Sequence, residues 1–320
     1  MLNTPARCPD SLAPSKPIRA PVEGIPGFRN RGPSGLLTLS PTNKEVAAVT
    51  VSDHAEVAVI TPTRLRTDRI PYLLELHTSL HQQDVKWQWV LALDGVPISQ
   101  LPARLRDDAR VQTVPLPRAV GAGAARNFAV NEVTADWCTT ADDDDLLPEG
   151  SLSARLRHAR EHGLGWCAGW SADLHADGAV STWNCPTPPG FHEAGDVWGY
   201  WPNPEATIPI GPTTLLARTD LIRASGGYAA LPQGEDYAYL VGITGTASGA
   251  LLPTVVYHYR KHPEQMTAQP SYPAMESRAR QFAWRHGKHL ASLRAEMTHR
   301  GSAFPRAVPR DHEHHSSISA

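Results

Sequence analysis

Residues 56–141 alternate between short apolar runs and segments in which apolar residues recur at helical spacing. Four apolar runs rich in β-branched or aromatic residues predict buried strands: Glu56–Thr61, Trp87–Leu93, Arg110–Val114 and Trp137–Ala141. Two intervening segments predict helices: residues 70–80, with an apolar face, and Gly121–Val133, which is rich in small residues. Strands that alternate with helices are typical of an α/β domain with a mainly parallel, Rossmann-like sheet flanked by helices.

The pattern also divides the chain into parts. Residues 1–53 are rich in Pro, Gly, Ser and Arg and have no sustained period, so we expect an extended or partly disordered arm. Residues 54–268 carry the α/β pattern. Residues 269–304 predict a C-terminal helical extension with a basic face, and residues 305–320 predict a flexible tail.

Composition excludes several classes of protein. The chain has 320 residues with a formal net charge of −2, which gives no electrostatic basis for binding nucleic acid. No apolar run is long enough to span a bilayer, and the N-terminus lacks the order of a secretion signal, so we expect a cytoplasmic protein. The four cysteines are widely spaced, which predicts reduced thiols and neither a zinc site nor a disulfide framework.

Polar residues follow three of the predicted strands. They are Thr61-Pro62-Thr63-Arg64, Asp94-Gly95 and Asp142-Asp143-Asp144-Asp145. The carboxyl ends of parallel strands meet at one edge of a sheet, where ligands bind. Adjacent carboxylates repel one another unless a cation neutralises them, and hard oxygen ligands suit Mg²⁺ or Mn²⁺. A solvated acidic turn is the simpler alternative for such a run, but the apolar strand before it favours a metal.

A calcium-binding loop does not fit these aspartates. Counted from Asp142, such a loop needs Gly at its sixth position and Glu at its twelfth, where this chain has Leu147 and Ser153.

Six segments in order resemble the family 2 glycosyltransferases, which have a GT-A fold. They are Val57-Ala-Val-Ile-Thr-Pro-Thr63, Leu91-Ala-Leu-Asp-Gly95, Gly121-Ala-Gly-Ala-Ala-Arg-Asn127, Ala141-Asp-Asp-Asp-Asp145, Gly226-Gly-Tyr228 with Gly234-Glu-Asp-Tyr237, and Tyr259-Arg-Lys-His-Pro-Glu-Gln-Met-Thr267. The resemblance covers about Glu56 to Thr267. It implies a nucleotide-binding half at 54–150 and an acceptor-binding half at 151–268.

The resemblance also implies a reaction. A single sugar would pass, with inversion, from a nucleotide-diphosphate donor to a hydroxyl of a small molecule or glycan, so the chain would be a hexosyltransferase. A UDP-sugar is favoured, with GDP- or dTDP-sugars as alternatives, and the cofactor would be Mn²⁺ or Mg²⁺. A homodimer is compatible with the basic helix. The processive relatives carry Q-x-x-R-W, whereas Gln281-Phe-Ala-Trp-Arg285 reverses the last two residues, so we expect a non-processive enzyme.

Roles follow from the same resemblance. Asp236 is the expected general base, with Glu235 as the alternate. The expected metal ligands are Asp144, Asp142, His262 and His258, of which the histidines have structural alternatives. The expected donor-binding residues are Thr61, Pro62, Thr63, Arg64, Asp94, Arg126, Asp142 and Asp143. From the aromatic-rich stretch 166–212, we expect Trp198, Tyr200 or Trp201 to face the acceptor, although core positions are the simpler account of several.

Three alternatives remain. A nicotinamide-dependent oxidoreductase is suggested by Gly121-Ala-Gly, but the sixth position of that segment is Arg126 and it follows the third predicted strand. A sugar nucleotidyltransferase would have a glycine-rich first loop, which residues 61–64 lack. A catalytically silent sugar-nucleotide-binding module would not need Asp236. The second strand also ends in Asp94-Gly95, where many relatives carry two acidic residues, which weakens the assignment of a nucleobase contact to Asp94.

Overall fold

The structure is a computed structural model that describes residues 54–302, with side chains described as far as Glu296. The predictions for residues 1–53 and 305–320 lie outside the described residues. The strands are β1 (Val57–Thr63), β2 (Trp87–Asp94), β3 (Val111–Leu116), β4 (Trp137–Thr140), β5 (Trp166–Leu174), β6 (Val180–Thr182), β7 (Gly190–His192), β8 (Leu216–Arg218) and β9 (Gly249–Arg260). The α-helices are α1 (Ile70–His81), α2 (Ala103–Arg106), α3 (Ala122–Asn131), α4 (Ser151–Glu161), α5 (Thr219–Ala224), α6 (Glu235–Thr246) and α7 (Tyr272–Ser302). Short 3-10 turns are η1 (Ile98–Gln100), η2 (Asp196–Tyr200), η3 (Pro212–Thr214) and η4 (Met266–Ala268).

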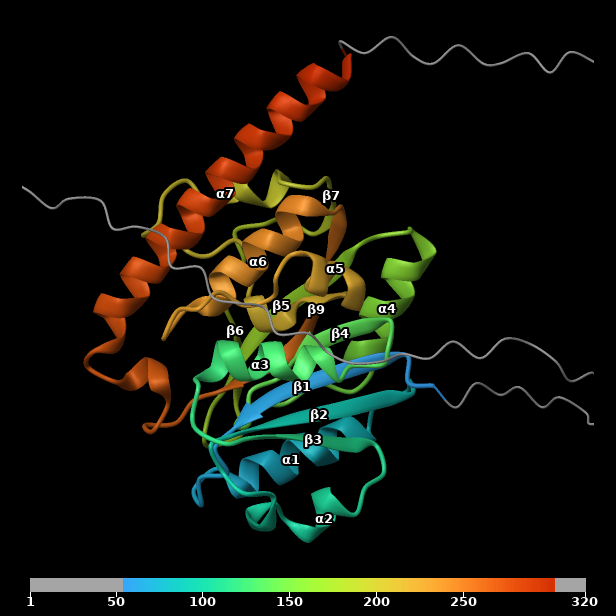
Figure 1. The fold of residues 1–320 in the computed structure, drawn as a ribbon, viewed down its shortest axis with the longest axis vertical. Coiled ribbons are helices and arrows are strands. Elements are labelled where there is room, and N and C mark those ends of the chain that lie inside the picture. The colour runs from blue at the N-terminus through green and yellow to red at the C-terminus, as the bar shows by residue number, and fades with distance from the viewer. Residues whose placement is uncertain (1–53, 303–320) are drawn as a thin grey trace, which may run out of the picture. The chain divides into compact units, whose positions relative to one another are not determined.

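The described strands form one mixed sheet in the order β3-β2-β1-β4-β8-β5-β9-β7, and β6 pairs with β5 at its end (Figure 1). The pairs β3–β2, β2–β1, β1–β4 and β5–β9 are parallel, and β8 runs antiparallel between β4 and β5. The strands β1, β2, β4, β5 and β9 therefore all point the same way, and their carboxyl ends share one edge. The mainly parallel α/β architecture expected from the sequence is confirmed.

Alternate residues of the strands bury two separate cores. Val57 and Val59 of β1 face α1 and α4, whose leucines complete the first core. Ala58 and Ile60 face α3, α5 and α6 on the opposite side, as Figure 1 shows for α1 and α3 about β1. Because successive strand residues point to opposite faces, a strand covered on both sides becomes a continuous apolar run. This explains the unbroken burial of β2 from Trp87 to Asp94.

The C-terminal helix α7 packs along α6 through a third, smaller apolar cluster. Tyr237 and Val241 of α6 meet Ala279 and Ala283 of α7, and Trp201 fills the space beside them. The indole N–H of Trp284 donates to the carbonyl of Trp201 at 3.0 Å. No helix among the described residues is long and apolar enough to cross a membrane.

β1 and β3 both run past the last residue predicted from the sequence, and both contain proline. β1 continues through Pro62 to Thr63 because β4 pairs with β1 only as far as Ile60, which leaves Pro62 beside β2 alone. β3 includes Pro115 and ends at Leu116. β3 lies at the edge of the sheet, where a proline breaks no ladder on its outer side.

Candidate active site

The ends of β1, β4 and β9 bring together segments that are far apart in the sequence. The four aspartates follow β4, Thr63 is the last residue of β1, and Arg69 lies in the loop after it. An isolated antiparallel bridge joins Leu146 to His258 of β9 through backbone bonds of 3.1 and 2.9 Å. The aspartates are therefore held between the two halves of the sheet, at the edge where the sequence predicts a ligand site.

Asp145 anchors the aspartate segment to β9. Its Oδ2 accepts a hydrogen bond from the Tyr257 hydroxyl at 2.7 Å, and its Oδ1 accepts one from the Arg260 backbone N–H at 2.8 Å. The Tyr257 hydroxyl also accepts the backbone N–H of Asp142 at 3.1 Å. Burial raises the pKa of Asp145 well above its usual value, and the charges of Asp144 and Asp142 raise it further. This carboxyl is therefore fixed in position and has a structural role.

Asp144 lies between the side chains of Arg69 and His262. Its Oδ2 is in contact with the Arg69 guanidinium and lies 2.9 Å from Nε2 of His262. Arg260 donates from Nε to the backbone carbonyl of Asp144 at 2.7 Å. Of the two histidines considered from the sequence, His262 contacts Asp144, whereas His258 joins the site through its backbone bridge to Leu146.

A buried guanidinium, that of Arg126, joins the aspartates to α6. Its Nη2 donates to Oδ1 of Asp142 at 2.5 Å, and its Nη1 donates to Oε1 of Glu235 at 2.6 Å. Burial disfavours the charge of Arg126, but Asp142 and Glu235 more than offset this and raise its pKa. Arg126 thereby holds the first turn of α6 against the end of β4.

Asp236 follows Glu235 in the first turn of α6 and differs from it in its surroundings. Glu235 is neutralised by Arg126, whereas no ion pair within residues 54–302 includes Asp236. Burial raises the pKa of Asp236 to about 7, and the neighbouring charge of Glu235 contributes to the rise. A carboxyl with such a pKa exchanges a proton near neutral pH, as a general base must.

The residues expected to bind the donor line the same edge, but several already have partners. The Thr61 hydroxyl accepts the indole N–H of Trp89 at 2.9 Å, and the Thr63 hydroxyl donates to Asp143 at 2.7 Å. Burial raises the pKa of Asp143 to about 6. Pro62 is half-buried and Arg64 is exposed.

Asp94 occupies the turn that leads into α3. Its Oδ1 accepts the N–H of Val120 at 2.6 Å, and its Oδ2 accepts the N–H of Gly121 at 3.3 Å. The carboxylate orders the start of α3, and its contact with a nucleobase stays a prediction.

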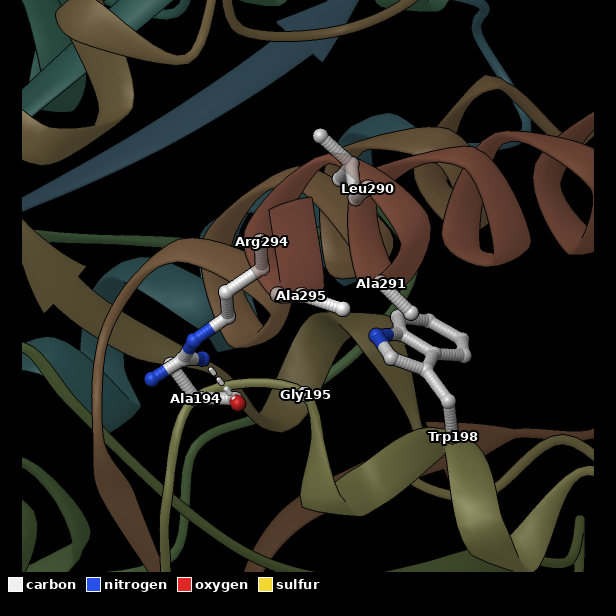
Figure 2. Close-up of a pocket in the computed structure, with 8 residues that line it drawn as sticks. Ala194, Gly195, Trp198, Leu290, Ala291, Arg294 and Ala295 are labelled. Carbon is white, nitrogen blue, oxygen red and sulfur yellow. Dashed lines mark hydrogen bonds between the residues drawn. The ribbon is translucent and has the colours of Figure 1, made fainter. Parts of the chain in front are cut away.

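The three aromatic residues expected at the acceptor side have different environments. Trp201 is 2% exposed and belongs to the core cluster between α6 and α7, so in this structure it presents no surface to an acceptor. Tyr200 is 37% exposed, and Trp198 is half-buried. Figure 2 shows Trp198 across from Leu290, Ala291 and Ala295 of α7, where it lines a cavity of about 320 Å³.

Three residues that hold the aspartates had no role in the sequence interpretation. No sequence signal marks Arg69, which precedes α1 and belongs to no motif. Tyr257 lies inside an apolar strand, so it is not marked either. Arg260 lies within the Tyr259-Arg-Lys-His262 segment, so the motif contained a signal for it. Their contacts span 75 to 116 positions of sequence, which local patterns do not report.

The aspartate edge suits a hard divalent cation that takes few protein ligands. Asp144 and His262 already meet at one point, whereas Asp142 faces Arg126 instead. Within the described part of the chain, the only group of three ligand side chains that could enclose a metal by itself lies elsewhere, at His77, His81 and Asp108. Mg²⁺ and Mn²⁺ commonly take one or two protein ligands and complete their shells with water and substrate phosphates. The residues present at the edge fit that mode of binding.

Gly123 of α3 keeps the helix close to α6. A Cβ at this position would lie 2.5 Å from Cγ of Glu235. We expect Gly123→Ala to displace Glu235 from Arg126 and to lower the free energy of unfolding by about 1–3 kcal/mol in urea denaturation. The control is Gly242→Ala in α6, where the nearest atom would be 3.5 Å away. That change should be neutral or stabilising, and equal losses in the two variants would contradict the close approach.

Comparison with known proteins adds a family and a fold. Residues 58–205 match the family model described as glycosyl transferase family 2. The matched segment includes β1 from Ala58 on, β2, β4 and the aspartates, whereas Asp236 and His262 lie beyond it. No curated protein sequence matches the chain.

Solved structures of S. aureus TarS have a similar fold. The structure of TarS 1-349 gives a TM-score of 0.51 at 17% identity, over 64% of this chain and 60% of that one. The complex of TarS 1-349 with UDP-GlcNAc gives 0.53 at 17% identity, over 67% and 61%. The complex with UDP gives 0.54 at 17% identity, over 78% and 73%. The match to the first of these structures thus spans about three fifths of its length, and at this identity the likeness concerns the fold.

Proposed function

Because its family 2 domain makes this chain a glycosyltransferase, we propose that it moves one sugar from a nucleotide-diphosphate donor to a hydroxyl acceptor, with inversion and without processivity. The donor would lie along the ends of β1, β2 and β4. The acceptor would approach from α6 and residues 198–200. Inversion requires a single in-line displacement and one base, which agrees with one available carboxylate beside several that are engaged.

The observation that carries the proposal is the contrast among the carboxylates of the site. Asp145 is bound by Tyr257 and the Arg260 backbone, and Glu235 is paired with Arg126. Asp236, one residue further along α6, combines a pKa of about 7 with freedom from ion pairs among residues 54–302. The Asp236 carboxylate would accept the proton of the acceptor hydroxyl as its oxygen attacks the anomeric carbon.

Asp144 and His262 would hold Mn²⁺ or Mg²⁺ together with the donor. The cation would neutralise the negative charge that develops on the leaving diphosphate. Arg69 contacts Oδ2 of Asp144, so its guanidinium would compete with a cation for this oxygen. Its guanidinium would then lie close enough to pair with a phosphate oxygen.

Uridine is the base that we propose for the donor. The support is that a protein of similar fold, S. aureus TarS, has been solved with UDP and with UDP-GlcNAc. The fold of that protein does not define the sugar or the base for this chain, so the first experiment compares several bases.

We expect UDP with Mn²⁺ to raise the thermal midpoint of the chain by several degrees, and GDP, dTDP or ADP to raise it less. A ligand at a hundred times its dissociation constant adds about 2.7 kcal/mol to the free energy of unfolding. In a chain of moderate size, each kcal/mol raises the thermal midpoint by about 2–4 °C. Asp144→Ala should abolish the metal-dependent part of the shift, whereas Asp84→Ala at an exposed loop position should keep it. A metal-independent shift that survives Asp144→Ala would overturn the proposed ligand.

A test of turnover separates the proposal from a silent binding module. A binding module would show the shift with UDP and Mn²⁺ but would not release UDP from any UDP-sugar, even by slow hydrolysis. The oxidoreductase alternative has no support in the fold, since Gly121 follows the edge strand β3, whereas a dinucleotide fingerprint follows the first strand.

A further inference from the structure

A second cluster of ligand-type side chains lies at the opposite edge of the sheet from the aspartates. His77 and His81 stand one turn apart near the end of α1, and Asp108 precedes β3. Helix α1 begins near the aspartate edge and runs back along the sheet, while β3 starts at the amino ends of the strands. The cluster is therefore separate from the proposed catalytic site.

Three ligand atoms of this cluster converge on one point. Nε2 of His77 lies 2.9 Å from Oδ2 of Asp108, and Nε2 of His81 lies 3.0 Å from the same oxygen. The two Nε2 atoms are 3.2 Å apart. Ligands at about 2.0–2.1 Å in a tetrahedral zinc site stand about 3.3 Å from one another. An expansion of a few tenths of an ångström would therefore turn this triangle into three corners of such a site.

Hydrogen bonds alone crowd the triangle. If both histidines donate from Nε2 to Oδ2 of Asp108, the two N–H groups converge on one oxygen with their nitrogens 3.2 Å apart, and Arg110 donates to the same oxygen. If one ring instead accepts from the other, one of the two short contacts with Asp108 has no proton. A cation that binds both Nε2 lone pairs and the carboxylate oxygen removes this conflict.

The surroundings orient the carboxylate for a cation. Oδ1 of Asp108 accepts the backbone N–H of Arg110 at 3.0 Å and its Nε at 3.0 Å, which leaves Oδ2 directed at the histidines. Hydrogen bonds of this kind to the second oxygen fix the orientation of metal-binding carboxylates. His77 is also fixed, because it is 2% exposed and stacks on Trp89 at 5.7 Å between ring centroids.

Arg110 is the competing cation. Its Nη2 lies 2.9 Å from Oδ2 of Asp108 and 2.9 Å from Nε2 of His81. The side chain is 43% exposed and rests on the ring of Trp87 at 4.1 Å, so it can swing into solvent without breaking the core. Its Nε bond to Oδ1 would then break, and the backbone N–H of Arg110 would still hold Oδ1.

We propose that His77, His81 and Asp108 form a zinc site with one open position, which ties the end of α1 to the start of β3. Two imidazoles and one carboxylate match Zn²⁺ and its substitute Co²⁺, whereas Mg²⁺ and Mn²⁺ prefer oxygen ligands. The two metal sites of the protein would then take different metals and be measurable one at a time.

The test titrates Zn²⁺ into the full chain against a chromophoric chelator, without nucleotide. Because His312, His314 and His315 near the C-terminus are potential ligands themselves, the background carries His312→Ala, His314→Ala and His315→Ala. We expect one Zn²⁺ per chain. His81→Ala should lower the affinity for Zn²⁺ by more than about 10–100-fold, which is the loss expected when only an outer-shell partner is removed. Asp144→Ala should leave it unchanged.

The matched control is His162→Ala. His158 and His162 also stand four residues apart at the end of a helix, with ring centroids 4.5 Å apart, but the described residues place no third ligand beside them. His81 has a side chain 41% exposed, so its replacement should leave the fold intact. Equal loss of zinc in the two variants, or no zinc bound above the His81→Ala level, would overturn the site.

Cobalt gives a readout of geometry. Co²⁺ bound to the same background should show the visible d–d absorption of a tetrahedral or five-coordinate site, and Asp108→Asn should remove it. An octahedral spectrum that Asp108→Asn leaves unchanged would show that the metal binds elsewhere.

Discussion

Asp236→Asn should lower kcat about 10²–10⁴-fold while donor binding stays intact, because general-base catalysis contributes about that factor. The amide is nearly the same size as the carboxyl but cannot accept the acceptor's proton. Glu235 cannot substitute for it, since both the Arg126 contact at 2.6 Å and the burial of Glu235 hold it in place. The measurement is steady-state turnover with a UDP-sugar, alongside UDP binding to the same variant.

The matched control for Asp236→Asn is Asp220→Asn, which changes an acidic residue in the first turn of α5. Its carboxylate pairs with Arg218 at the surface, and its loss should leave turnover unchanged. Wild-type kcat/KM should rise with pH as Asp236 ionises near pH 7. Normal turnover by Asp236→Asn, or a flat profile through this range, would show that another group takes the proton.

The same carboxyl should cost the protein stability. The pKa of Asp236 rises from 3.8 to about 7 on folding, so between these values the folded chain holds a proton that the unfolded chain has released. Below pH 4 the carboxyl is protonated in both states and costs no stability. As the pH rises from 4 to 7, the unfolded chain releases the proton first, so the free energy of unfolding falls. Asp236→Asn should therefore stabilise the chain by up to about 4 kcal/mol at pH 8 and by little at pH 4.

Arg126→Met should be the most destabilising single change at the site, by about 3–5 kcal/mol, because it leaves the buried Glu235 and the half-buried Asp142 without a counter-charge. Arg126 is 5% exposed and contacts both Asp142 and Glu235. Urea denaturation measures the loss. The control is Arg218→Met, which breaks an exposed pair with Asp220 and should cost about 0–1 kcal/mol.

A double variant keeps the Arg126 prediction testable if Arg126→Met folds poorly. Adding Glu235→Gln to Arg126→Met removes one of the two carboxylate charges that have lost their partner, and it should restore part of the free energy of unfolding. Arg126→Lys retains the charge but cannot reach both carboxylates with a planar fork, so it should fall between wild type and Arg126→Met. If the double variant is no more stable than Arg126→Met, the cost comes from packing and not from unpaired charge.

The sequence predicted the first four strands and the ligand edge because both depend on local order, whereas β5 to β9 were not predicted. A continuous apolar run indicates a strand that is buried on both faces, as β2 is. The parallel arrangement of these strands then places Thr63, Asp94 and the aspartates at one edge of the sheet. The family match over residues 58–205 agrees with the motifs read there.

The roles of individual residues were less predictable, because they depend on contacts between distant segments. Nothing local distinguishes Trp201, which fills the core between α6 and α7, from Tyr200, which is more exposed. Nothing local marks Arg69 as the partner of Asp144, 75 positions away. Nothing local marks His77 and His81 as possible ligands, because the third member of their cluster, Asp108, comes from a loop later in the chain.

The anchoring of the aspartates to β9 has a consequence for how the chain folds. Asp145 receives both of its hydrogen bonds from residues more than 100 positions later, and the Leu146 bridge also waits for His258. Contacts of such sequence separation form slowly, because the loop between them must close first. During synthesis the aspartate segment would leave the ribosome long before β9. Arg69, Thr63 and Arg126, the partners of Asp144, Asp143 and Asp142, would already have emerged, whereas Asp145 would have no partner until the last third of the chain followed. The aspartate segment would thus become ordered late in folding. The need for chaperones should then depend more on the time between synthesis of the aspartates and synthesis of β9 than on the stability of the folded sheet.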